Sequence, residues 1–96
     1  MSFVAVVASP LLIAHVRNPG GQGGRRITAG RLDGDWALKV ATGGDREPSV
    51  TPYASENALV HAYNAALRDA GRAGLTSRPE PVALTVDALR AAEQAL

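Results

Sequence analysis

The stretch that decides the fold is RITAGRLDGDWALKVAT, residues 26–42. Two runs of alternating apolar and polar residues flank Asp33 and Gly34. This pair favours the two-residue type I′ turn of a β-hairpin, because both turn positions need positive φ. Such a turn sets the cross-strand pairs Ile27–Val40, Ala29–Leu38, Arg31–Trp36 and Leu32–Asp35.

The two-residue turn sorts the hairpin side chains into two faces. The apolar face is closed at the turn by Arg31 and carries Ile27, Ala29, Trp36, Leu38 and Val40. The opposite face carries Thr28, Gly30, Leu32, Asp35, Ala37 and Lys39. A three-residue loop would move one strand's side chains to the wrong face, so the two-residue turn is preferred. Arg31 beside Trp36 predicts a cation–π stack, and Gly30 indicates either a close packing contact or a bulge.

Composition indicates one small domain with a thin core. The 96 residues are 46% apolar, but alanine supplies much of that fraction and only four residues are aromatic. Small side chains bury little area, so self-association is a common remedy and a homodimer is one expectation. Cysteine is absent, which excludes disulfides and thiolate metal sites.

The first apolar run, residues 3–16, predicts strand structure. It lacks the basic start of a signal peptide, and it is too short for a membrane span and broken by Ser9 and Pro10. We expect one strand kinked at Pro10 or two short strands, no membrane contact and a cytoplasmic location. The glycine-rich residues 18–24 predict a flexible loop.

The remaining chain completes an α+β fold with three to four antiparallel strands. Residues 11–17, 26–32 and 36–42 are expected to form a meander, followed by a linker loop over 43–51. A long amphipathic helix is expected over 53–70, since Leu59, Ala62, Tyr63, Ala66, Leu67 and Ala70 follow helical spacing.

The helix ends leave alternatives open. Either Thr51 or Ser55 caps the long helix, and Gly71 is a natural residue to end it. Residues 82–86 alternate like a short strand. A C-terminal helix follows over 86–95 with Thr85 as its cap, either packed on its own chain or contacting a second copy.

No motif predicts catalysis, a metal or a cofactor. His15 lies in an apolar run and His61 on a polar helix face, and neither has a second ligand at helical spacing. The GGQGGRR segment, residues 20–26, resembles a phosphate loop but lacks the following Lys-Ser/Thr pair and opens a strand. We therefore predict a non-enzymatic protein.

Two binding functions remain. The first is a protein–protein interaction module, whose partner is another protein or its own copy. The alternative is a nucleic-acid-binding domain using the basic N-terminal half, where six basic against three acidic residues give +3 over 1–46. Its element order resembles AP2-type and integrase-arm domains, which read DNA with a sheet, although the loop 43–51 is longer than in those families. The candidate partner-binding residues are Arg25, Arg26, Thr28, Lys39, Asn57, His61, Asn64 and Arg68.

Overall fold

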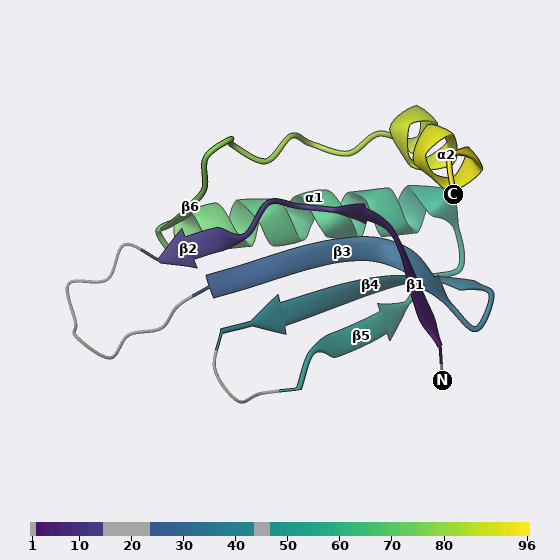
Figure 1. Ribbon diagram of the computed structural model, residues 1–96, viewed down its shortest axis with the longest axis horizontal. Coiled ribbons are helices and arrows are strands. Elements are labelled where there is room, and N and C mark those ends of the chain that lie inside the picture. The colour runs from purple at the N-terminus through teal and green to yellow at the C-terminus, as the bar shows by residue number, and fades with distance from the viewer. Residues whose placement is uncertain (1, 15–23, 44–46) are drawn as a thin grey trace.

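The computed structural model describes residues 2–14, 24–43 and 47–96, which form a six-stranded antiparallel sheet with a long helix beside it (Figure 1). This confirms the predicted α+β class. The elements are β1 (Phe3–Ala8), β2 (Leu12–Ala14), β3 (Gly24–Leu32), β4 (Asp35–Thr42), β5 (Ser49–Pro52), α1 (Glu56–Arg72), β6 (Leu75–Thr76) and α2 (Val86–Gln94). The strand order is β5-β4-β3-β2-β6, and β1 also pairs with β3.

The central hairpin has the register that its turn residues dictate. β3 and β4 pair Ile27 with Val40 and Arg31 with Trp36, as the two-residue turn predicts. Asp33 and Gly34 both adopt positive φ, at 51° and 92°. Local turn chemistry therefore fixes which face of the hairpin is apolar.

The N-terminal apolar run forms two short strands that share one edge of β3. β1 pairs along residues 28–32 of β3, and β2 pairs with its first two residues. Ser9, only 2% exposed, joins them: its amide donates to the Ile27 carbonyl (2.8 Å), and its hydroxyl accepts from the Ile27 amide (3.0 Å). Of the two alternatives, two short strands is the correct one.

Gly30 is a packing contact between β1 and β3. A Cβ atom at this position would run into the Val4 carbonyl oxygen and lie 2.8 Å from Cζ of Phe3. The register irregularity falls in β1, between Ala5 and Val7. Strand β1 therefore approaches the β3 backbone where no side chain intervenes.

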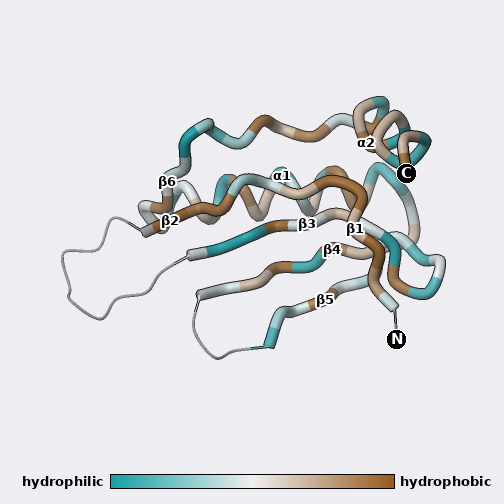
Figure 2. The backbone as a smooth tube through the Cα atoms, viewed as in Figure 1, coloured by the Kyte–Doolittle hydropathy of each residue, from teal (hydrophilic) through white to brown (hydrophobic). Residues whose placement is uncertain are grey.

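The core lies between the sheet and α1. Leu59 and Tyr63 of α1 are buried in one cluster with the apolar hairpin face. Ser55 caps the helix, since its hydroxyl accepts from the Ala58 amide (3.2 Å). Thr51, the other capping candidate, lies in β5. Figure 2 shows apolar residues along much of β1 and a hydrophilic start to β3.

Two predicted details of the C-terminal half are wrong. The long helix does not end at Gly71 but continues to Arg72, and the left-handed position is Gly74 (φ 83°). Residues 82–86 are not a strand; the backbone of Leu84 is instead held by the Asn64 side chain, which accepts from its amide (2.7 Å) and donates to its carbonyl (2.9 Å).

The final helix packs on its own chain. Thr85 caps α2 as predicted, and Leu89 is fully buried. Arg90 also pairs with Glu56 at the start of α1 (2.7 Å). No helix in the described part of the chain is long and apolar enough to cross a membrane.

Strands β5 and β6 were not anticipated. The predicted linker 43–51 is wrong at its end, because residues 49–51 belong to β5, which pairs with β4 from Ala37 to Val40. β6 pairs with β2. The predictions for His15 and for most of the glycine-rich loop fall outside the described residues, as do those for residues 44–46 of the linker.

Candidate functional site

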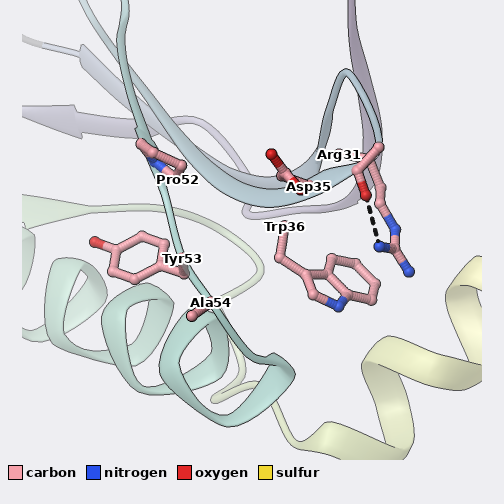
Figure 3. A pocket seen from close by; sticks show the side chains of 7 residues that line it. Arg31, Asp35, Trp36, Pro52, Tyr53 and Ala54 are labelled. Atoms are coloured by element: carbon pink, nitrogen blue, oxygen red, sulfur yellow. Dashed lines mark hydrogen bonds between the residues drawn. The ribbon is translucent and has the colours of Figure 1, made fainter.

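An open cleft of about 480 Å³ lies at the tip of the central hairpin (Figure 3). We call it the tip cleft; its lining residues are Arg31, Gly34, Asp35, Trp36, Pro52, Tyr53 and Ala54. It forms because β4 and the chain after β5 separate at this end of the sheet. The Tyr53 amide donates to the Trp36 carbonyl (2.8 Å), and the chain then turns away towards Ser55 and α1.

The positive charge in the tip cleft is already paired. The Arg31 guanidinium donates to both carboxylate oxygens of Glu93 on α2, from Nε at 2.7 Å and from Nη2 at 3.2 Å. It also donates to the Gly34 carbonyl (2.9 Å) and stacks on Trp36, 3.7 Å from the ring centroid. The predicted cation–π pair is therefore present.

The Arg31–Glu93 pair perturbs both partners. The hydrogen bond that Arg31 donates to Glu93 raises the pKa of Arg31 and lowers the pKa of Glu93. In both groups burial has a smaller, opposite effect on the pKa. Bidentate geometry of this kind is the strongest form of a carboxylate–guanidinium contact. Both groups stay charged at neutral pH, so together they add no net charge to the tip cleft.

Asp35 is the second charged residue that lines the tip cleft. Its side chain is exposed, and it makes no side-chain hydrogen bond or ion pair within the residues that the structure describes. Arg31, which is near enough for Asp35 to raise its pKa, is already engaged with Glu93. The charges of Arg31, Glu93 and Asp35 therefore sum to −1 at neutral pH.

A second exposed feature, the free edge of β5, adjoins the tip cleft at Pro52. Among the described residues, β5 is the last strand on its side of the sheet, and all four of its residues are exposed. The Tyr53–Trp36 hydrogen bond sets the alternation of the antiparallel ladder, so Thr51 and Ser49 point their backbone groups at β4. The amide and carbonyl of Val50 then point outward, away from the sheet.

Four of the predicted partner-binding residues lie on β3 and β4, and their environments differ. Arg26, Thr28 and Lys39 share the sheet face opposite α1, with Thr28 directly across from Lys39, whereas Arg25 belongs to the other face. Thr28 is only 7% exposed. The Lys39 ammonium lies 5.5 Å from the centre of the Phe3 ring, so β1 also reaches this face.

The other four predicted residues lie on α1. Asn57, His61 and Arg68 are exposed on the helix. Asn64 is half-buried, and its amide is used within the chain to hold Leu84. The eight residues therefore divide between a sheet face and a helix face, and none of them lines the tip cleft.

The sequence did not reveal the tip cleft or the free edge. The Arg31–Trp36 half of the cleft follows from the hairpin register, and Asp35 was placed next to the turn. Pro52, Tyr53 and Ala54 join it only because β5 pairs with β4, and β5 has four residues that are all exposed, so no buried face identifies it. Nothing near residue 31 in the sequence indicates that Glu93 is its partner.

Comparisons with known proteins assign no family. No protein-family model, no curated protein and no solved structure matches the chain. Within the described residues, no three histidine or carboxylate side chains gather as a metal site would require. The physical features of the tip cleft and of β5 are thus the basis for a functional proposal.

Proposed function

We propose that this chain is a small non-enzymatic, cytoplasmic protein-binding module that takes an extended segment of its partner along the free edge of β5. The observation that carries the proposal is the outward-pointing backbone of Val50 on an exposed strand without a charged residue. Strand addition uses such unpaired amide and carbonyl groups for affinity and neighbouring side-chain sites for specificity.

The side chains along β5 favour this mode of binding. Val50 is 37% exposed, and its neighbours Ser49 and Thr51 are also uncharged. Natural edge strands are commonly protected by lysine, by proline, by a bulge or by a covering loop. Within the residues that the structure describes, the only such feature on β5 is Pro52, which closes one end and leaves Val50 accessible.

A second copy of the chain is one possible occupant of the edge. Two β5 strands paired across a two-fold axis would extend each sheet without rearranging either subunit. Light scattering over a concentration series distinguishes this case. A dimer that becomes a monomer on Val50→Pro identifies the second copy as the partner, whereas a monomer throughout leaves another protein as the occupant.

The alternative, nucleic-acid binding by the sheet, gains less support. Arg26 is exposed on the face opposite α1, but Thr28 is buried there and Phe3 lies beneath Lys39. Strand β5 also separates the hairpin from the helix, unlike the three-strand-then-helix order of AP2-type domains. Duplex DNA binding with a steep salt dependence would favour this alternative.

Peptide selection tests the proposed function. A library of random peptides is panned against the immobilised chain, with Val50→Pro as the counter-target. This substitution removes an outward-pointing amide donor and no hydrogen bond of the β4–β5 ladder, so the fold is expected to survive, and urea unfolding verifies that. We expect enriched sequences that bind the wild-type chain and lose at least about tenfold affinity for Val50→Pro. Enriched sequences that bind both proteins equally, or no enrichment, would refute strand addition.

A further inference from the structure

We propose that the tip cleft receives a lysine or arginine side chain of the partner segment, with Asp35 as the recognition group. The inference rests on the proposed function, since a segment lying along β5 ends beside Pro52, which borders the cleft. It adds the chemical class of the partner: an extended segment with a basic residue at the end nearest the hairpin tip.

Charge complementarity is the first reason for a basic side chain. Arg31 is held by Glu93 in a bidentate pair, so its charge is not available to attract an acidic ligand. Asp35, the other charged lining residue, is exposed and makes no such pair within the residues that the structure describes. A cation entering the tip cleft therefore gains an attraction to Asp35, and an anion meets a repulsion.

The shape of the cleft supplies the second reason. Pro52 and Asp35 share one sheet face at this edge, since Pro52 pairs with Ala37, whereas the apolar Trp36 ring lies on the α1 side of the same edge (Figure 3). The aliphatic part of a lysine or arginine side chain packs on apolar surface while its charged end stays near water. Asp35 at the cleft's rim suits that arrangement.

The test compares two blocked hexapeptides, Lys-Thr-Val-Thr-Val-Lys and Glu-Thr-Val-Thr-Val-Glu. A charged residue at both ends makes the test independent of strand direction. Trp36 is the only tryptophan of the chain and lines the tip cleft, so its fluorescence reports cleft occupancy. The backbone amide resonance of Val50 reports occupancy of the β5 edge separately.

The decisive variant is Asp35→Lys, with Asp69→Lys as the matched control. Both reverse one exposed carboxylate, but Asp69 lies near the far end of α1. We expect the wild-type chain and the Asp69→Lys variant to bind the lysine peptide about 3- to 10-fold more tightly than the glutamate peptide. Asp35→Lys is expected to reverse this order.

Three outcomes would overturn the inference. They are equal binding of the two peptides by the wild-type chain, equal effects of the two charge reversals, and no Trp36 response to the lysine peptide up to about 1 mM. The Val50 resonance separates this failure from that of the proposed function. A peptide that shifts Val50 without discriminating charge removes the basic-residue inference and leaves strand addition in place.

Discussion

Replacing Gly30 with alanine is expected to destabilise the protein severely. The added methyl group would run into the Val4 carbonyl oxygen. It would also lie 2.8 Å from Cζ of Phe3 and 3.1 Å from the carbonyl carbon of Val4. Phe3 has a side chain that rotates, but the Val4 backbone is fixed by pairing with β3. Overpacking lowers the free energy of unfolding by about 1–3 kcal/mol. Because the clash is with backbone, we expect Gly30→Ala to lower it by about 3 kcal/mol.

Urea unfolding followed by Trp36 fluorescence measures this loss. For an unfolding slope of about 1–1.5 kcal/mol per M, a loss of about 3 kcal/mol lowers the midpoint by about 2–3 M. The control is Gly71→Ala, where the added methyl group meets nothing within 4 Å on an exposed helical position. That change should stabilise the protein by about 0.5–1 kcal/mol. Equal midpoints for Gly30→Ala and the wild type would refute the close approach of β1 to β3.

Three further predictions follow from the polar contacts. Glu93 has a lowered pKa, so its contribution is present above the ordinary glutamate pKa and is lost as pH falls through the lower folded value. Glu93→Gln should therefore flatten the acid limb of stability below about pH 4.5 and cost up to about 1 kcal/mol at pH 7, because the pair is a third exposed. Unchanged pH profiles would contradict this. Asn64→Ala should cost about 1–3 kcal/mol and speed hydrogen exchange of the Leu84 amide, and continued protection of that amide would argue against the contact. Ser55→Ala should cost about 1 kcal/mol in urea unfolding through loss of the helix cap, and an unchanged midpoint would show that the cap contributes nothing.

The predictable part of this fold is the part governed by local chemistry. The Asp33-Gly34 turn sets the whole β3–β4 register, because a two-residue turn admits one pairing that keeps apolar residues on one face. The caps at Ser55 and Thr85 are also local, because each hydroxyl accepts a hydrogen bond from the amide three residues later. Each of these features is decided within a few residues of the chain.

Other features depend on contacts between distant segments. Residues 82–86 alternate like a strand, yet the backbone partner of Leu84 is the Asn64 side chain, twenty residues away. β5 has only four residues, all exposed, and it forms by pairing with the edge of β4. The sequence predicts Asn64 as a partner-binding residue for the same reason: a polar residue on a helix gives no sign that a later segment of the chain will cover it.

The charge of the tip cleft is a property of the docked C-terminal helix as much as of the hairpin. Arg31 faces Trp36 through the hairpin register alone, and a hairpin without α2 would present that guanidinium to an acidic ligand. Glu93 neutralises it from 62 residues away, which leaves Asp35 to set the sign. Because Leu89 is fully buried, docking of α2 is coupled to formation of the core. The preference of the cleft for a cation therefore arises only in the completed fold, and the hairpin sequence by itself would suggest the opposite ligand.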